Sequence, residues 1–470
     1  MNGDHSNVGE ASSPNSNEQL PMSLGEYSRY GRQMILPSMG LPGQLKLRKS
    51  RVLVIGAGGL GCPSIQYLVA AGVGHITVLD HDTVEKSNLA RQILHTDERV
   101  GMNKALSASI ASKIINPFVH VEPVQTSLSV ENAVSLINTH DIVLDCTDNV
   151  LTRYLISDAA VKCGRQVVSG AAQGFDGQLV VLHKDLRSGA SASGVCDSSP
   201  EHTTPIPRGP CYRCLFPKAP RPEEVTDCED GGVLGTITGL VGTMQAFETI
   251  KLLSGIEDYE EDDKGRPIVG MTLVSPLSFP PFKSVRLRPR RITSCRACGD
   301  PNQMQPELIN SMLAKDLRDE NYIGFCGLTN GRKLNGFDEI TVSNLAKLNA
   351  QSQSKVHIID VRPKVEFEIT HLPNTTNVPF RQIDSDPKKW YTSILNSIQE
   401  TSDDHQLYVL CRRGNDSRLA CHALAAAADI ADGNDPDTKP SDKQSKIRFT
   451  NITGGLRAWS NEVDETFPVY

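Results

Sequence analysis

The sequence predicts an α/β protein with two domains, a doubly wound parallel sheet followed by a smaller α/β domain. The chain has 470 residues, which is too long for one ordinary core. From about residue 50 to 183, short β-rich runs alternate with helical patterns, as they do in parallel sheets. A second alternation of this kind begins at residue 338. The apolar content of 39% is enough to build a core in each domain.

The expected strands are short runs rich in Val, Ile and Leu. Helical patterns such as 104–115 and 151–163 lie between those of the first domain. The strand candidates there are residues 51–56, 75–80, 141–146, 165–170 and 178–183. In the second domain we expect strands at 356–361, 407–411 and 448–455, and a helix at 417–428.

Composition excludes several classes of protein. Residues 1–22 are polar and are expected to form a disordered tail, not a secretory signal. The apolar segment 233–255 is interrupted by Gln245, Glu248 and Lys251, so a buried helix is expected there and no membrane span. A net charge of −7 and 5% aromatic residues argue against direct nucleic-acid binding. We therefore expect a cytoplasmic protein.

The pattern along the chain also predicts a linker at 301–337, before the second domain at 338–470.

A nucleotide site is predicted where GAGGLG at 56–61 follows the first strand and opens a helix. Glycines let the backbone approach a phosphate, and the helix N-terminus offers free N–H groups to it. Asp80 ends the next strand, where a carboxylate can bind ribose hydroxyls. Alone, this fingerprint also fits NAD. Lys104, an arginine in the segment 81–92 and the carboxylates of 145–149 favour a Mg-bound triphosphate over a hydride carrier.

These motifs, namely GAGGLGC, LDHDTVEKSNLARQ, Lys104 and CTDN, resemble the MoeB/ThiF family of adenylating enzymes over about residues 23–300. The resemblance implies that Asp148 binds Mg²⁺ and that Arg32 reaches the ATP of a second subunit, so that the protein is a homodimer. It also implies an ATP-binding set made of Arg32, Gly59, Asp80, Ser87, Asn88, Leu89, Ala90, Arg91, Lys104, Asp148 and Asn149. Gly59 would pack on the nucleotide and Asp80 would hold its ribose. The substrate implied is the C-terminal Gly-Gly carboxylate of a ubiquitin-like protein.

Two C-x-x-C pairs predict a tetrahedral zinc site. They are Cys211 with Cys214 and Cys295 with Cys298. In a reducing compartment this spacing points to metal before disulfide, and four thiolates complete a closed structural site. We expect one such zinc ion per subunit, clamping the segment after residue 185 to the adenylation core.

Cys228 lies in a loop, VTDCEDGG, before the long apolar helix. Its position resembles that of the loop cysteine with which ubiquitin-activating relatives form an acyl-enzyme, so it is a candidate for a thioester or for reductive release. The helix N-terminus lowers a thiol pKa, whereas the neighbouring acidic residues oppose that effect. A loop cysteine without a covalent role remains the alternative.

Cys411 ends the expected strand LYVLC and opens the loop RRGNDS before a helix. Such a loop can direct several N–H groups at one sulfur, and Arg412, Arg413 and Arg418 add positive charge. We therefore expect surroundings that favour a thiolate or a persulfide anion. By contrast, the cysteines in or beside apolar runs are expected to be core thiols: Cys62, Cys146, Cys163 and Cys421.

The second domain resembles rhodanese-like sulfurtransferases in DVR at 360–362, CRRGNDSR and ITGGLRAW. The fused order resembles the eukaryotic enzymes that adenylate ubiquitin-like sulfur carriers and convert them to thiocarboxylates. That resemblance implies a carrier protein as substrate, with the small subunit of molybdopterin synthase as a possible one. It also implies a cysteine desulfurase or other sulfur donor, and products used in tRNA wobble-uridine thiolation and molybdenum-cofactor synthesis. The alternative is a plain modifier-activating enzyme whose rhodanese module is regulatory.

Overall fold

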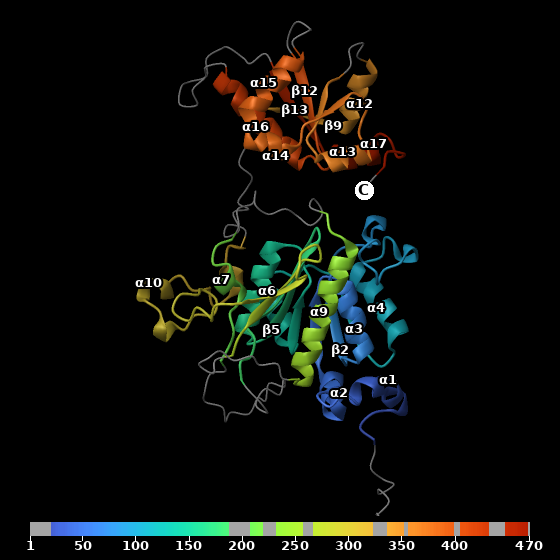
Figure 1. The fold of residues 1–470 in the computed structure, drawn as a ribbon, viewed down its shortest axis with the longest axis vertical. Helices are drawn as coiled ribbons and strands as arrows, with labels where there is room; N and C mark the ends of the chain where they lie inside the picture. The colour runs from blue at the N-terminus through green and yellow to red at the C-terminus, as the bar shows by residue number, and fades with distance from the viewer. Residues whose placement is uncertain are drawn as a thin grey trace, which may run out of the picture. The chain divides into compact units, whose positions relative to one another are not determined.

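The structure is a computed structural model that describes residues 20–187, 207–219, 232–256, 267–322, 336–351, 356–398, 405–431 and 447–468. Contacts divide the chain into two compact units, residues 1–329 and residues 330–470. Each unit has its own sheet, with helices on both of its faces (Figure 1). This is the α/β architecture that the alternation of strands and helices predicts.

Eight strands of the described residues form one mixed sheet in the first unit, in the order β3-β2-β1-β4-β5-β6-β7-β8. The first five strands in this order are parallel to one another, and the pairs from β5 to β8 are antiparallel. The strands are β1 (Arg51–Ile55), β2 (His75–Leu79), β3 (His120–Val124), β4 (Ile142–Asp145), β5 (Gln166–Gln173), β6 (Asp176–Leu182), β7 (Gly270–Val274) and β8 (Phe282–Arg286).

Two details differ from the expected parallel sheet. Only residues 174 and 175 separate β5 from β6. A parallel connection needs a crossover of about a dozen residues, so this short link makes an antiparallel hairpin. Strand β3 was not predicted, because Glu122 and Pro123 interrupt its apolar pattern. It lies at the edge of the sheet, where proline is tolerated.

Alternate side chains of the parallel strands enter two separate cores. Val52 and Val54 of β1 pack in one core, and Leu53 and Ile55 pack in the other. Helix α9 lies beside α3 on the first face, as Figure 1 shows. The helices contributing to the first core are α2 (Gly40–Lys49), α3 (Gly61–Ala71), α4 (Lys104–Ile115) and α9 (Gly235–Ser254), and those of the second are α5 (Ala133–Asn138) and α6 (Val150–Lys162).

Helix α9 is the apolar segment for which the sequence predicts a buried helix. Its Gln245 is fully buried, and the side-chain amide donates to the carbonyls of Asp145 at 2.9 Å and Val168 at 3.0 Å. These bonds fasten the helix to β4 and β5. Among the described helices, none is long and apolar enough to cross a membrane.

The first part of the segment predicted as a linker packs against the first unit. It contains α10 (Pro306–Ile309). Leu317 is 1% exposed in the core beside α6, and the Tyr322 hydroxyl donates to Asp158 at 2.9 Å. Residues 301–322 therefore form a strap over α6.

The first unit begins with α1 (Leu24–Met34), whose N-terminus is held by a capping box between Ser23 and Glu26.

In the second unit, five described strands form a parallel sheet in the order β11-β10-β12-β13-β9. One core lies under α14, α15 and α16, and the other lies under α12 and α17. The elements are β9 (Asp338–Thr341), α12 (Val342–Gln351), β10 (Ile358–Asp360), α13 (Lys364–Ile369), β11 (Thr375–Asn377), α14 (Phe380–Ser385), α15 (Pro387–Ile398), β12 (His405–Leu410), α16 (Asn415–Ala431), β13 (Ile447–Thr453) and α17 (Gly455–Glu462).

Candidate active sites and metal centre

A pocket of about 1040 Å³ lies at the carboxyl ends of β1, β2 and β4, where the glycine-rich turn begins α3. Gly56 has φ +98°, and a Cβ there would lie 2.7 Å from the carbonyl oxygen of Cys146. At Gly61 a Cβ would come within 2.0 Å of the Gly56 carbonyl. The close turn therefore requires glycine at both positions, and it leaves the backbone open to a phosphate.

Asp80 directly follows β2 and holds the glycine-rich turn by hydrogen bonds. One carboxylate oxygen accepts the N–H of Ala57 at 2.7 Å, and the other accepts the N–H of Asp82 at 2.9 Å. Asp80 also lines the pocket, so both contacts fix the direction of a carboxylate at the pocket wall.

Lys104 brings a positive charge into the pocket from the start of α4. Its side chain is buried, and Nζ donates to a carboxylate oxygen of Asp82 at 2.9 Å. Arg91 lines the same pocket. A lysine and an arginine that line one pocket with a Gly-rich turn are suited to bind a polyphosphate.

The other side of the pocket is formed by the turn between β4 and α6. Asp148 is exposed there, and Asn149 caps the helix by accepting the N–H groups of Leu151 at 2.8 Å and Thr152 at 3.2 Å. Beneath them, Arg153 pairs with buried Asp145 at 3.0 Å. The exposed carboxylate is thus carried on a turn that both the cap and the buried ion pair hold in place.

The structure brings together most of the predicted nucleotide residues. Those that line the pocket are Gly59, Asp80, Asn88, Arg91, Lys104, Asp148 and Asn149. Ser87, Leu89 and Ala90 belong to the same turn but do not line it, and Arg32 is exposed on α1, away from the pocket lining. Cys228 lies outside the described residues, as do Cys196 and Cys326.

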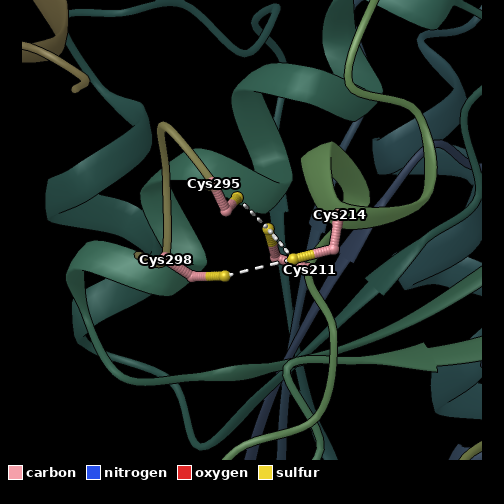
Figure 2. A group of neighbouring side chains, drawn as sticks. All are labelled: Cys211, Cys214, Cys295 and Cys298. Carbon is pink, nitrogen blue, oxygen red and sulfur yellow. Dashed lines mark hydrogen bonds between the residues drawn. The ribbon is translucent and has the colours of Figure 1, made fainter. Parts of the chain in front are cut away.

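Four cysteine sulfurs converge between α7 (Tyr212–Leu215) and the loop after β8 (Figure 2). The Sγ atoms are 3.8 Å apart for Cys211 and Cys214, 3.6 Å for Cys211 and Cys295, and 3.4 Å for Cys214 and Cys298. A zinc ion with Zn–S bonds of about 2.3 Å places its tetrahedral sulfurs about 3.8 Å apart. The four side chains therefore fit a zinc ion in their present arrangement.

The surroundings of the cysteine cluster hold it in place. The backbone N–H of Arg291 donates to the Cys214 sulfur at 3.4 Å. Arg213, inside the first C-x-x-C, makes a bidentate ion pair with fully buried Asp158 of α6, at 2.8 to 3.0 Å. Tyr322 of the strap donates to the same carboxylate. One buried acid thus ties together α6, the metal-binding turn and the strap.

In the second unit, Cys411 directly follows β12, and its loop wraps around the sulfur. The backbone N–H of Gly414 donates to Sγ at 3.0 Å, and the Ser417 hydroxyl lies 3.3 Å from it. Gly414 has φ +93°, and a Cβ there would lie 2.8 Å from the backbone nitrogen of Gly454. The start of α17 donates to the loop carbonyls, from Leu456 to Cys411 at 3.1 Å and from Arg457 to Arg412 at 3.0 Å.

The pKa of Cys411 corrects one expectation from the sequence. Burial raises the pKa of this thiol above its ordinary value, because the side chain is 3% exposed. The Ser417 hydroxyl and the backbone N–H groups of Ser417 and Arg413 lower it, but they do not outweigh burial. The expectation that the surroundings of Cys411 favour a thiolate was therefore wrong for the free thiol, because burial outweighs the loop groups even though these lower the pKa as expected. Arg418, one of the three arginines expected to add positive charge near the sulfur, is itself exposed and leaves the Cys411 side chain buried.

The DVR motif forms a buried ion pair at the end of β10. Arg362 is 1% exposed and Asp360 is fully buried, with Nε 2.9 Å from both carboxylate oxygens. The guanidinium also donates to the carbonyl of Thr370 at 2.8 Å. Asn377 donates to the carbonyls of both motif residues. The motif thus holds β10, β11 and the segment after α13 together.

Comparison with known proteins identifies both units. The ThiF family matches residues 30–297, and the rhodanese-like domain matches residues 343–462. The adenylyltransferase and sulfurtransferase UBA4 of Lodderomyces elongisporus is 41% identical over 97% of this chain and 90% of its own length. The adenylyltransferase and sulfurtransferase MOCS3 of Drosophila sechellia is 39% identical over 97% of this chain and 88% of its own length.

The chain belongs to the ThiF family, in its fused UBA4/MOCS3 form. As a UBA4/MOCS3-type protein it is an adenylyltransferase and sulfurtransferase, and its first unit is of a family that binds ATP. The dehydrogenase that a lone glycine fingerprint also fits is thereby excluded. The resemblance in the two halves of the sequence is confirmed.

Sequence reasoning missed several residues of this UBA4/MOCS3-type chain. Asp82 pairs with Lys104, Arg153 supports the Asp148 turn, and Ser417 contacts the Cys411 sulfur. Asp82 could have been predicted as a site residue, because it lies two residues beyond Asp80 at the end of the same strand. Arg153 carried no signal, since nothing in a helical pattern shows which side chain turns back to the preceding strand.

Proposed function

We propose that this protein activates the C-terminal Gly-Gly carboxylate of a ubiquitin-like sulfur carrier with ATP and then converts it to a thiocarboxylate. The observation that carries the proposal is the presence of two reactive sites in one chain. One is a nucleotide pocket with Lys104 and Asp148, and the other is a loop whose Gly414 N–H and Ser417 hydroxyl point at the Cys411 sulfur.

In the first step the carrier carboxylate attacks the α-phosphorus of ATP. A bond forms between a carboxylate oxygen and the α-phosphorus. The bond from the α-phosphorus to the oxygen that bridges to the β-phosphate breaks, and pyrophosphate leaves with that electron pair. Negative charges approach each other in this step. The positive charges of Lys104 and Arg91 stabilise the transition state more than the bound substrates, and they thereby lower the barrier. Asp148 would hold Mg²⁺, which supplies further charge neutralisation at the phosphates. Asp80 would hold the ribose.

The pocket rim supports a protein substrate. Gln173, Asp176 and Ser275 line the pocket, and exposed apolar side chains lie next to them in the β5–β6 and β7–β8 turns. Phe175 is 50% exposed and Phe279 is 96% exposed. We assign this rim to the folded part of the carrier, whose flexible C-terminal tail would enter the pocket.

Cys411 delivers the sulfur in the second step. Loaded as a persulfide by a cysteine desulfurase or other sulfur donor, its outer sulfur attacks the acyl carbon. A C–S bond forms, the C–O bond breaks, and AMP leaves. A second thiol then attacks the Cys411 sulfur of the acyl disulfide, and the thiocarboxylate leaves with the transferred sulfur. A persulfide is a stronger acid than a thiol, so loading offsets the raised pKa of Cys411.

Cys228 is our candidate for the second thiol. It would form a disulfide with Cys411 as the thiocarboxylate leaves, and an external thiol would reduce that disulfide. Alternatively, Cys228 first takes the acyl group from the adenylate as a thioester. Both routes use the same reactants and products, and they differ in which cysteine first holds the acyl group.

The remaining assignments complete the proposal. We assign one structural zinc ion per subunit to Cys211, Cys214, Cys295 and Cys298, whose sulfur spacing suits it. We also propose a cytosolic homodimer in which Arg32 of one subunit reaches the ATP of the other. The thiocarboxylate would serve tRNA wobble-uridine thiolation and molybdenum-cofactor synthesis, with the small subunit of molybdopterin synthase as one acceptor, and conjugation of the carrier to proteins is a further use.

Mass spectrometry of a carrier after incubation with ATP, this protein and a sulfur donor tests the proposal. The expected product has one sulfur in place of one oxygen at the carrier C-terminus, with wild-type protein and not with Cys411→Ala. Acyl-adenylate without any sulfur gain in the wild-type reaction would refute the second half of the proposal. An unmodified carrier would refute both halves.

A modifier-activating enzyme with a regulatory rhodanese module is the second candidate, because Cys411 is 3% exposed. A thiosulfate sulfurtransferase assay separates the two. Turnover that disappears in Cys411→Ala supports sulfur transfer, whereas absence of turnover by the wild-type protein supports the regulatory module.

A further inference from the structure

A cluster of metal-binding side chains lies at the edge of the first sheet opposite the nucleotide pocket. His75 begins β2 and His120 begins β3, and these two residues are directly paired in the parallel register. The next pair on the same face is Thr77 with Glu122. The pocket lies at the carboxyl ends of the strands, so the cluster at their amino ends is a separate place on the molecule.

The ligand atoms of the cluster already lie close together. One nitrogen of each histidine and one oxygen of Glu122 all lie within 4.8 Å of one another. His75 Nε2 is 3.2 Å from the Glu122 carboxylate, and the two imidazole rings have their centroids 4.8 Å apart. Zinc bound at about 2.0 to 2.2 Å needs its ligand atoms a little over 3 Å apart. His120 and Glu122 are exposed and can make that small rotation.

A buried layer behind the cluster orients His75. The Thr77 hydroxyl lies 3.2 Å from His75 Nε2 and 2.8 Å from Nε2 of His140. His140 is 3% exposed, and its other ring nitrogen lies 2.7 Å from the carbonyl of Leu136. These contacts position the His75 Nε2 atom that also faces Glu122, and a metal ion bound at that nitrogen would replace its contact with the Thr77 hydroxyl.

One positive charge opposes a cation at this place. Arg51 is paired with His75 across β1 and β2, and its NH2 group lies 3.3 Å from His75 Nε2. Its Nε donates to the carbonyl of Thr139 at 3.0 Å, so the guanidinium is held nearby. This charge disfavours weakly bound hard ions such as Mg²⁺, whereas two imidazoles and a carboxylate suit zinc.

We propose that His75, His120 and Glu122 form a second divalent-metal site, separate from the four-cysteine cluster, that takes zinc with water in the remaining position. Three protein ligands leave a coordination position open, unlike the closed four-cysteine site. The site depends on neither the adenylation nor the sulfur-transfer proposal, because none of its residues lines the nucleotide pocket or belongs to the second unit.

Calorimetric titration of the full-length protein with Zn²⁺, after its thiol-bound zinc has been quantified, tests the proposal. The wild-type protein should bind one further zinc ion. His120→Ala and Glu122→Gln should each weaken that binding by at least about tenfold. Arg51→Gln should tighten it about threefold, because it removes the opposing charge.

His81→Ala is the matched control, because His81 belongs to a different group of possible ligands, with Asp80 and Asp82 at the nucleotide pocket. This variant should retain the further zinc ion. ATP–pyrophosphate exchange by His120→Ala at the wild-type rate shows that the variant is folded. The proposal is overturned if no further zinc binds, if binding survives in both ligand variants, if Arg51→Gln weakens it, or if His81→Ala abolishes it.

Discussion

At the scale of single residues, the reactivity of Cys411 is set by two opposing effects. Burial raises the pKa of its thiol, and the Ser417 hydroxyl together with loop N–H groups lowers it. Ser417 also lies 2.7 Å from the side-chain oxygen of Asn451 on β13. A hydroxyl has one proton, so Asn451 and the sulfur compete for it. Asn451 is therefore a positioning residue for Ser417.

Replacing Ser417 with Ala should raise the pKa of Cys411 further, because a hydrogen bond that stabilises the thiolate is lost. Because the folded pKa lies above its ordinary value, alkylation of Cys411 should still be increasing at alkaline pH in the wild-type protein. Alkylation rates measured by peptide mass spectrometry across pH report the shift.

Cys421→Ala is the control for that experiment. Cys421 is fully buried in the same core, and its thiol pKa is raised mainly by burial. The Cys411 profile should keep its wild-type midpoint in this variant. If Ser417→Ala also keeps the wild-type midpoint, the hydroxyl has no influence on the thiolate.

At the scale of elements, the turn from β4 into α6 joins stability and catalysis. Asn149 caps α6, and Asp148 faces the pocket one residue earlier. Asp148→Asn should abolish ATP–pyrophosphate exchange and leave the thermal unfolding midpoint unchanged. Asn149→Ala should lower the free energy of unfolding by about 1 kcal/mol, because a cap is lost.

Exchange assays and calorimetry of the two variants check this division. Equal loss of stability in both variants would mean that the Asp148 carboxylate is a structural group. Full exchange activity in Asp148→Asn would remove this residue from the proposed magnesium site.

The strap over α6 is a second element whose contribution can be measured. Tyr322 donates to Asp158, which is fully buried and already paired with Arg213 beside the cysteine cluster. Tyr322→Phe should cost about 1.5 kcal/mol of unfolding free energy in the first unit, as expected for a buried hydrogen bond to a charged group. Denaturant unfolding monitored by intrinsic fluorescence and zinc release gives that value, and an unchanged midpoint would show that the strap is passive.

At the scale of the whole molecule, the two compact units predict separable half-reactions. Cys411→Ala should keep carrier-dependent ATP–pyrophosphate exchange at the wild-type rate, because Cys411 belongs to the second unit and the nucleotide pocket to the first. It should lose labelled sulfane sulfur completely. A large fall in exchange in this variant would show that the units act as one.

The same separation predicts local effects on stability. Asp360→Asn breaks the buried pair with Arg362, and leaving a buried charge uncompensated costs about 3 to 5 kcal/mol. Differential scanning calorimetry should show a lower transition for the second unit alone, with exchange activity retained. A shift of the whole profile would mean that the units unfold together.

Local patterns predicted much of this protein. The GAGGLG turn and the loop from Cys411 each join a strand end to the next helix, and each C-x-x-C pair spans only four residues, so their chemistry can be read from adjacent residues. The alternation of strands and helices likewise predicts both α/β units, because strands buried on two faces are nearly continuous apolar runs, whereas the helices between them repeat their apolar residues with a helical period. The residues that support these sites, such as Arg153 and Asn451, carry no comparable pattern.

The sequence by itself therefore determined the two α/β units, the glycine-rich turn, the paired cysteines and the reactive loop, since each depends on residues close together in the chain. Tertiary structure alone decided the antiparallel half of the first sheet, the raised pKa of Cys411, and the meeting of His75 with His120 and Glu122. The physical reason is that strand pairing and burial depend on segments distant in sequence. A side chain's charge and reach are known from its type, but its neighbours and its access to water are known only once the chain has folded.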